Sequence, residues 1–177
     1  MTPPPPEIDP RTIHQLGSLV IRGTSGNLQD IIAQLSHPAP LLEILTIEAE
    51  RDLVVTTALF EGDLSTLREL CLHCIRTRLP WRNMANLTSF TLGYTPPGEI
   101  SITQLLDFFE SAHRLCQVRL SFVPLAPGKQ DRRLVSLPCL KLLIICRDQP
   151  AFFLVGHLLI PAGAILSTEL ESPHPPY

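Results

Sequence analysis

Charged residues are scarce in this chain and are not concentrated in one sign. They make up 18% of the 177 positions, the net charge is −3, and the pI is near 6.0. Nucleic-acid-binding domains carry a basic patch or stripe, so this composition predicts no nucleic-acid partner. The one basic cluster, Lys129 with Arg132 and Arg133, has no aromatic residue interleaved for base stacking, and we expect it to be a solvated loop.

Long hydrophobic runs and an export signal are also absent. The longest uncharged apolar stretch, 151–160, is about half of the roughly 20 residues that a membrane-spanning helix needs. The amino terminus has four consecutive prolines and lacks the basic and apolar regions of a secretory signal. We therefore expect a cytoplasmic or nuclear protein with no membrane partner, whose five cysteines are reduced thiols.

Recognisable catalytic and metal-binding patterns are lacking as well. Cys71 and Cys74 have the spacing of half a zinc site, but the chain contains no second such pair, and on a strand the two side chains would face opposite ways. The histidines are scattered, and no serine, cysteine and acid stand in a catalytic order. The sequence therefore predicts a protein that is not an enzyme and that has no cofactor and no metal.

The chain does contain a recurring pattern, L-x-x-L-x-L, with Ile, Val or Phe allowed at the second and third positions. Its first leucines lie 26, 25, 20, 28 and 25 residues apart, close to the about 20 to 29 residues of leucine-rich repeats. The six copies are Leu16-Leu19-Ile21, Leu42-Leu45-Ile47, Leu67-Leu70-Leu72, Leu87-Phe90-Leu92, Leu115-Val118-Leu120 and Leu140-Leu143-Ile145. The spacing predicts an α/β leucine-rich-repeat solenoid: a short horseshoe arc with parallel strands on the concave face and helices or irregular segments on the convex face.

The repeats divide the chain into three expected parts. Residues 1–12 are a disordered proline-rich leader, residues 13–171 form a domain of about six to seven repeats, and residues 172–177 are a loose tail. A weak seventh copy, Ile165-Thr168-Leu170, begins one further period of 25 after Leu140. Either this copy or the tail would cover the last strand and protect the open edge of the sheet.

Four helices are expected on the convex side. Ser101 and Gln104 have capping-box spacing ahead of an apolar run, which predicts a helix over 101–113. The other three are a helix capped by Asn27, a helix that begins at Asp52 and ends near Gly62, and a helix over 151–159 that Pro150 opens.

The period of two within each strand predicts which side chains face outward. The second and third apolar residues of each copy point to the core, while the residues flanking them point to the concave face. Six strands spaced by about 4.8 Å would make a surface roughly 25 Å across, sufficient for a peptide or a small domain face. Leu142, Ile144 and Cys146 would form an apolar row there, and such rows tend to mark contacts. The outward residues expected to contact a partner are Arg22, Thr46, Glu48, Glu69, His73, Thr91, Gln117, Arg119, Leu142 and Ile144.

Three ordered segments carry a resemblance to a known family. In the first, Pro80-Trp81 precedes the strand entry Asn86-Leu87-Thr88; the second joins the helix from Ser101 to the strand 115–120; the third covers 135–143, followed later by Ile160-Pro161-Ala162-Gly163. Over roughly residues 40 to 170 the chain resembles the repeat region of fungal F-box-like domain-containing proteins. The resemblance implies a protein-protein interaction module: the substrate-recognition region of an SCF-type ubiquitin ligase subunit, in which the repeats hold the ubiquitination target.

The chain departs from this family in two respects. The helical F-box that docks the Skp adaptor has no counterpart ahead of the repeats, so a Skp partner is expected only if an F-box is supplied upstream. The position eight residues after each first leucine, where many leucine-rich repeats carry asparagine, holds Thr24, Glu50, Ile75, Thr95, Val123 and Asp148. The alternative function is a truncated or degenerate structural fragment of a longer F-box-like receptor, with no independent function.

Overall fold

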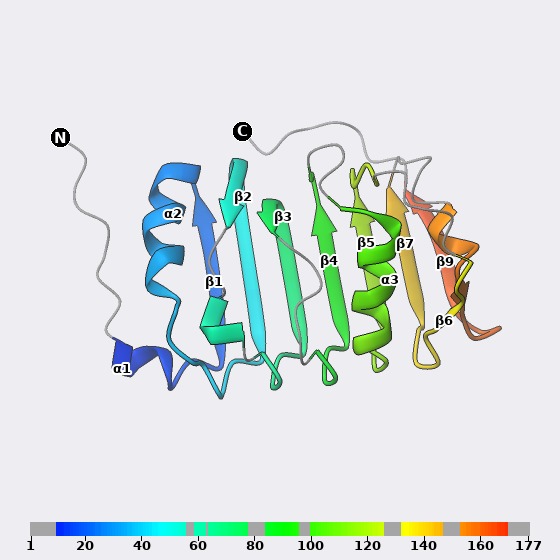
Figure 1. The fold of residues 1–177 in the computed structure, drawn as a ribbon, viewed down its shortest axis with the longest axis horizontal. Coiled ribbons are helices and arrows are strands. Elements are labelled where there is room, and N and C mark those ends of the chain that lie inside the picture. The colour runs from blue at the N-terminus through cyan, green and yellow to red at the C-terminus, as the bar shows by residue number, and fades with distance from the viewer. Residues whose placement is uncertain are drawn as a thin grey trace.

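Seven parallel strands lie in chain order in one sheet, so each strand hydrogen-bonds to the one before it and the one after it (Figure 1). The computed structural model describes residues 10–55, 59–62, 64–77, 84–95, 100–125, 132–146 and 153–169. The strands are β1 (Ser18–Gly23), β2 (Ile44–Val55), β3 (Glu69–Thr77), β4 (Ser89–Gly93), β5 (Gln117–Ser121), β7 (Leu142–Cys146) and β9 (Ile165–Glu169). The predicted α/β class and the predicted parallel pairing are confirmed. Each of the first six strands begins two residues after the first leucine of a copy.

All seven strands share one register. Ser18 pairs with Ile44, Ile44 pairs with Glu69, and the row continues across the sheet to Ile165. The second apolar residue of each copy therefore lies beside its equivalents, and from Leu45 to Leu143 these side chains are no more than 1% exposed. The alternation predicted within each strand is confirmed, because the third apolar residues from Ile47 to Ile145 are equally buried.

Each repeat has a further buried position that the six-residue pattern does not include. It lies three residues before the first leucine, and the amide of that leucine donates a hydrogen bond to its carbonyl oxygen, as in Leu67 N to Leu64 O at 3.0 Å. The residues at this position are Ile13, Ala39, Leu64, Met84, Ala112 and Leu137, all 3% exposed or less. The backbone turn is repeated while the side chain varies, which is why the sequence pattern did not reveal it.

The residue after each first leucine links neighbouring repeats through its carbonyl oxygen. The carbonyl of Glu43 accepts the amides of Arg68 and Glu69 at 2.8 and 3.0 Å, and the same pair of bonds recurs at the carbonyls of Gly17, Arg68, Thr88 and Cys116. These bonds hold the register at the amino-terminal end of each strand.

The segments on the core side of the sheet differ from repeat to repeat. The helices α2 (Ser25–Gln34) and α3 (Ile102–Ser111) lie over the same face of the sheet, and their buried residues join one core with the strands (Figure 1). The smaller elements are α1 (Pro10–Ile13), a 3₁₀ helix η1 (Leu59–Gly62), and a two-stranded parallel sheet of β6 (Val135–Ser136) and β8 (Leu158–Leu159). No helix in the described ranges is both long and apolar enough to span a membrane.

The helix predicted from the capping box is confirmed. The Oγ of Ser101 accepts a hydrogen bond from the Gln104 amide at 3.2 Å, and Gln104 Oε1 accepts one from the Ser101 amide at 2.8 Å. The helix α3 ends at Ser111, two residues earlier than expected.

The other three expected helices need correction. Asn27 is not a cap, because α2 begins at Ser25 with Thr24 at the N-cap position. Asp52 lies inside the long strand β2, which ends in the strand-favouring Val54 and Val55, so within 52–55 and 59–62 the helical part of the prediction is reduced to the 3₁₀ helix η1. Within 153–169 the helix predicted over 151–159 is limited to 153–155, and β8 follows it.

The weak seventh copy is a strand, but its predicted register is wrong by two residues. Ile165 was predicted at the position of a first leucine, equivalent to Leu140. It pairs with Leu142 and so lies two residues after that position. Leu166 and Thr168 therefore take the core-side positions, and Gly163 stands where the other copies have their first leucine. A shift of two residues leaves the face of every side chain unchanged.

Some predictions concern residues outside the described ranges. Pro80, Trp81 and Lys129 are among them, as are most of the predicted leader and the predicted tail. Of the basic cluster, Arg132 is exposed and Arg133 forms ion pairs with Asp107 and Glu110 of α3.

Candidate functional site

The side chains opposite the core form three rows across the sheet, which we call the open face. The first row is Ser18, Ile44, Glu69, Ser89, Gln117, Leu142 and Ile165; the second is Val20, Thr46, Cys71, Thr91, Arg119, Ile144 and Ser167; the third is Arg22, Glu48, His73, Gly93, Ser121 and Cys146. The ten residues predicted to contact a partner all fall in these rows. The common register therefore places on one face side chains that lie up to 122 positions apart in the sequence.

The open face is accessible in its first two rows and closed along part of its third. Glu69 and Gln117 are exposed, and Arg119 is half-buried. Ser121 and Cys146, in the third row, are 1% and 0% exposed. The expectation that Cys146 displays its side chain on the concave face is therefore wrong.

A left-handed backbone residue recurs after the third row of the open face, inside β3 and directly after β4 and β5. Cys74, Tyr94 and Phe122 each follow a third-row residue directly and have φ values of 53° to 55°, in the left-handed region. The rings of Tyr94 and Phe122 stack with centroids 4.8 Å apart. Left-handed backbone is uncommon outside glycine, so its recurrence at three equivalent positions shows that this conformation belongs to the repeat.

A cavity lies beside Cys74 and Tyr94, and we call it the carboxyl-end pocket. It has a volume of about 360 Å³ and is lined by Glu48, Ala49, Glu50, Arg51, Asp52, His73, Cys74 and Tyr94. The register of β2 against β3 shifts between Glu48 and Leu53, and the additional residues of β2 form one side of the cavity. The His73 ring lies over Gly93, where an added Cβ would come within 3.0 Å of it.

The carboxylates at this end of the sheet are largely neutralised by arginine. Arg22 Nε and Nη2 donate to both oxygens of Glu48, and Arg76 Nη2 donates to Asp52 at 2.8 Å. The hydrogen bond from Arg22 to Glu48 raises the pKa of Arg22. These pairs are largely solvent-exposed and contribute little to stability, but the pair with Arg22 orients Glu48 on the open face.

Two cysteines on β3 are poor nucleophiles. Burial raises the pKa of the Cys71 thiol to about 11, and the carboxylate of Glu48 adds to the shift. Burial also raises the pKa of Cys74, with Asp52 as the second cause. Both thiols are neutral near pH 7, whereas nucleophiles and metal ligands are thiolates. Within the described ranges, no three His, Cys, Asp or Glu residues are grouped so that they could hold a metal ion.

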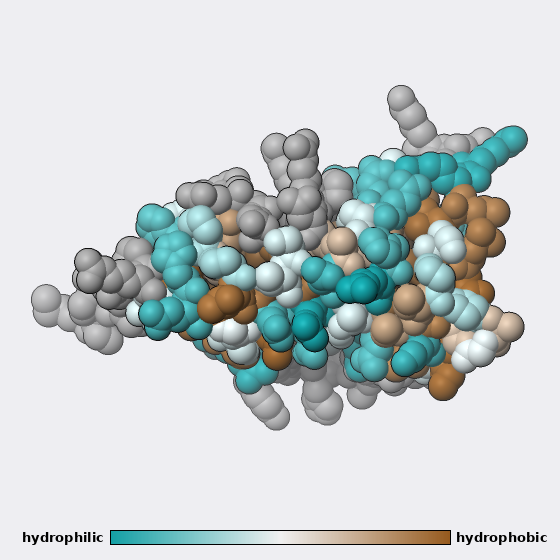
Figure 2. All heavy atoms as spheres, turned by 90° about the horizontal axis from the view of Figure 1, so that it is seen from below, coloured by the Kyte–Doolittle hydropathy of each residue, from teal (hydrophilic) through white to brown (hydrophobic). Residues whose placement is uncertain are grey.

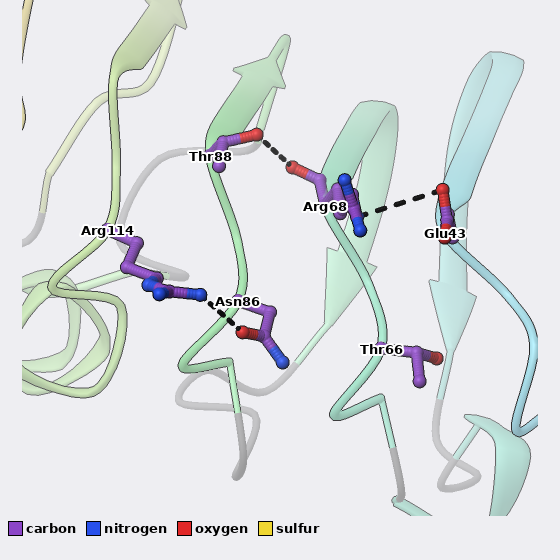
Figure 3. A pocket seen from close by; sticks show the side chains of 6 residues that line it. All are labelled: Glu43, Thr66, Arg68, Asn86, Thr88 and Arg114. Carbon is purple, nitrogen blue, oxygen red and sulfur yellow. Dashed lines mark hydrogen bonds and ion pairs between the residues drawn. The ribbon is translucent and has the colours of Figure 1, made fainter.

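A second cavity lies at the amino-terminal ends of the strands, and we call it the amino-end pocket (Figure 3). Its volume is about 260 Å³, and its lining residues flank the first leucines of consecutive repeats: Glu43, Thr66, Arg68, Asn86, Thr88 and Arg114. The sequence reasoning missed this pocket, because these residues stand outside the strands. The signal that would have found it is the pair of positions immediately before and after each first leucine.

Hydrophobic side chains gather at the end of the sheet that holds β9. Five large ones are between 45% and 71% exposed there: Leu134, Phe153, Leu159, Ile165 and Leu166. Figure 2 shows the hydrophobic surface at that end of the molecule, in contrast to the largely hydrophilic middle. The predicted exposed row of Leu142, Ile144 and Cys146 is not found as such: Leu142 and Ile144 are half-buried and Cys146 is fully buried, while Ile165 of β9, which was not in the row, is exposed.

Comparison with known proteins found no match among family models, curated proteins or solved structures.

Proposed function

We propose that this chain is a leucine-rich-repeat solenoid whose open face binds another protein, and that it is not an enzyme. The common register of the seven strands supports the proposal most strongly, because it lines up the outward side chains in rows while the inward ones form the core. Repeat arrays with this layout present long surfaces to partners. Six strand spacings of about 4.8 Å give a surface roughly 29 Å across.

The chemistry of the open face fits a protein partner. Its middle carries charged and polar groups such as Glu69, Thr91 and Arg119, and its last strands carry Leu142, Ile144 and Ile165. Protein interfaces combine apolar contacts with polar ones. We therefore expect the partner to place an apolar segment over β7 and β9 and polar groups over β3 to β5.

The resemblance to F-box-like proteins supports a more specific form of the proposal. In that form the partner is a ubiquitination target, and the Skp adaptor joins only through an F-box supplied upstream. A Skp pull-down tests the ligase role alone, because absence of binding leaves the recognition role open. The second candidate function is a fragment of a longer receptor with no partner of its own, which the exposed apolar residues beside β9 favour.

Charge reversal on the open face tests the protein-binding role. The bait is the whole chain, as the wild type, as Arg119→Glu, and as the matched control Asp30→Lys on the exposed side of α2. A protein captured by the wild type is then purified and titrated against all three. We expect Arg119→Glu to lose about tenfold or more in affinity and Asp30→Lys to lose none. Equal affinity for all three would exclude the open face as the interface.

The same substitutions separate binding from folding. Because Glu69 is exposed and Arg119 is half-buried on the outward side, Glu69→Lys and Arg119→Glu should each change the free energy of unfolding by only about 0.5 kcal/mol. Thermal unfolding followed by circular dichroism measures this. A large fall in the melting temperature would mean that these side chains belong to the core and that the face assignment is wrong.

A further inference from the structure

Positive charge exceeds negative charge in the amino-end pocket. The lining includes two guanidinium groups, Arg68 and Arg114, and one carboxylate, Glu43. The whole chain has a net charge of −3, so this local excess runs against its average. An excess of guanidinium groups around a cavity favours an anionic occupant.

Arg114 is held at the pocket without a carboxylate partner. Asn86 Nδ2 donates to the carbonyl oxygen of Ser65 at 2.7 Å, and Asn86 Oδ1 accepts a hydrogen bond from Arg114 Nη1 at 3.0 Å (Figure 3). Among the residues whose positions are described, Arg114 has no ion pair. A neutral amide therefore positions this guanidinium and leaves its charge uncompensated.

Among the residues that the structure describes, the ion-pair partner of Arg68 is a distant one. Arg68 Nε lies 3.7 Å from Glu43 Oε2, beyond hydrogen-bond distance, and the two side chains are 63% and 53% exposed. A pair this exposed is screened by water and is worth about 1 kcal/mol or less. Arg68 can therefore exchange Glu43 for an incoming anion at little cost.

The other hydrogen-bond donors around the pocket already donate to backbone carbonyl oxygens. A ligand would therefore bind mainly through the two guanidinium groups. The Thr66 and Thr88 hydroxyls donate to the carbonyl oxygens of Leu42 and Arg68 at 2.9 and 3.1 Å. The backbone amides at the starts of β3, β4 and β5 donate to the carbonyls of the preceding repeat. The guanidinium N–H groups are left as the main donors, and their planar fork matches the oxygens of a carboxylate or a phosphate.

The spacing of the two arginines suits one anion between them. Arg68 directly precedes β3 and Arg114 stands three residues before β5, with β4 between these strands. Two strand spacings of about 4.8 Å separate the backbones by roughly 10 Å, a distance that two long side chains and one bound oxyanion span. Both arginines line the same cavity of about 260 Å³.

We propose that the amino-end pocket binds an oxyanion, a carboxylate or phosphate group, between Arg68 and Arg114. The anion is an acidic or phosphorylated side chain of the protein partner. In this respect the inference rests on the proposed function. Arg68 and Thr88 directly precede Glu69 and Ser89 of the first row, so the pocket borders the open face.

Titration of the whole chain with inorganic phosphate and with acetate tests the pocket itself. Chemical shifts of the amides of residues 66–68 and 86–88 report binding, and the variants are Arg68→Gln, Arg114→Gln and the double variant. We expect each single variant to weaken phosphate binding about fivefold and the double variant to abolish it. Arg51→Gln, a matched exposed arginine in the carboxyl-end pocket, should bind as the wild type does.

Glu43 supplies a test in the opposite direction. Glu43→Gln removes the only carboxylate among the described residues of the lining, so phosphate affinity should rise about threefold. No phosphate shift in the wild type, or equal shifts in the wild type and the double arginine variant, would overturn the proposal.

Peptides distinguish the two sources of the anion. A phosphoserine peptide is compared with otherwise identical glutamate and serine peptides: preference for phosphoserine alone indicates phosphate, and binding of both charged peptides indicates either oxyanion. Equal binding of all three would overturn the assignment to a partner's side chain. Arg119→Glu on the open face should leave phosphate binding unchanged, so a failure of the open face and a failure of the pocket give different results.

Discussion

The two ends of the sheet differ in how they cover the apolar side of the outermost strand. Beside β1, the helix α2 packs onto the core, and its Leu28 and Ile32 are 1% and 4% exposed. Beside β9, the described elements are the short paired strands β6 and β8, which come from two successive connections, and five large hydrophobic side chains are exposed. The comparison shows that a repeat buries its apolar residues only where a neighbour or a helix lies against them.

The sequence of the last repeat explains part of this difference. Gly163 stands in place of the first leucine, and Thr168 pairs with Ile145 in the row of third apolar residues. These two positions offer the core less apolar surface than their equivalents do. The seventh repeat therefore continues the sheet while adding little to the core.

The largest expected difference is in the free energy of unfolding, between a substitution at the centre of the sheet and one at the β9 end. Phe90 is fully buried, with its ring centroid 4.5 Å from that of Phe108, and Phe90→Ala should lower the free energy of unfolding by about 3 to 5 kcal/mol. Leu166, at 45% exposure, should cost about 1 kcal/mol or less when changed to alanine. Urea denaturation of both variants measures the two values. Similar losses would show that the β9 end is packed as tightly as the centre.

A smaller difference in stability is expected between substitutions at the N-cap positions of the two long helices, α3 and α2. Ser101→Ala removes a capping box and should cost about 1 kcal/mol. Thr24 occupies the same position before α2 but makes no side-chain capping bond, so Thr24→Ala should cost much less. Chemical denaturation compares the two variants directly. An equal loss at Thr24 would mean that α2 is capped in solution.

Thiol reactivity sharpens the comparison of the centre with the β9 side. Cys71, with a pKa of about 11, should react with iodoacetamide much more slowly at pH 8 than the exposed Cys139, because the thiolate is the reactive form. Mass spectrometry of labelled peptides measures both rates. Equal rates would contradict the burial of Cys71.

The same pKa shift has a consequence for stability. A thiol whose pKa is raised from about 9 to about 11 on folding stays protonated up to a higher pH in the folded state than in the unfolded state. Its contribution to stability is therefore complete below pH 9 and is lost as the pH rises toward 11. Cys71→Ser should reduce the fall of the melting temperature across that range.

The smallest effect on stability is expected at the exposed residues of β9. Ile165→Lys replaces a 63% exposed apolar side chain with a charge, so the melting temperature should change little while solubility rises. Val20→Lys, at an outward position of β1 with 52% exposure, is the matched change at the other end. Light scattering against concentration measures self-association. An equal gain from both substitutions would remove the difference between the two ends.

The sequence predicted the parallel strands and the outward rows because both follow from a pattern of two-residue alternation that recurs at fixed spacing. It did not predict the buried position at Ile13 and its equivalents, where a backbone turn is conserved between repeats but the side chain is not. It missed the register of β9, because two residues fewer separate Leu142 from Ile165 than the preceding period suggested. It did not predict the left-handed residues Tyr94 and Phe122, or the burial of Ser121 and Cys146 in the third row, and it missed the amino-end pocket because its lining residues lie outside the pattern.

The common register is the claim on which the open face depends, and nuclear Overhauser effects between neighbouring strands measure it directly. Contacts between backbone protons should connect Thr46 with Cys71, Cys71 with Thr91, and Thr91 with Arg119, as the pairing requires. Contacts displaced by one residue in any of these strands would turn its leucines toward solvent and contradict the account.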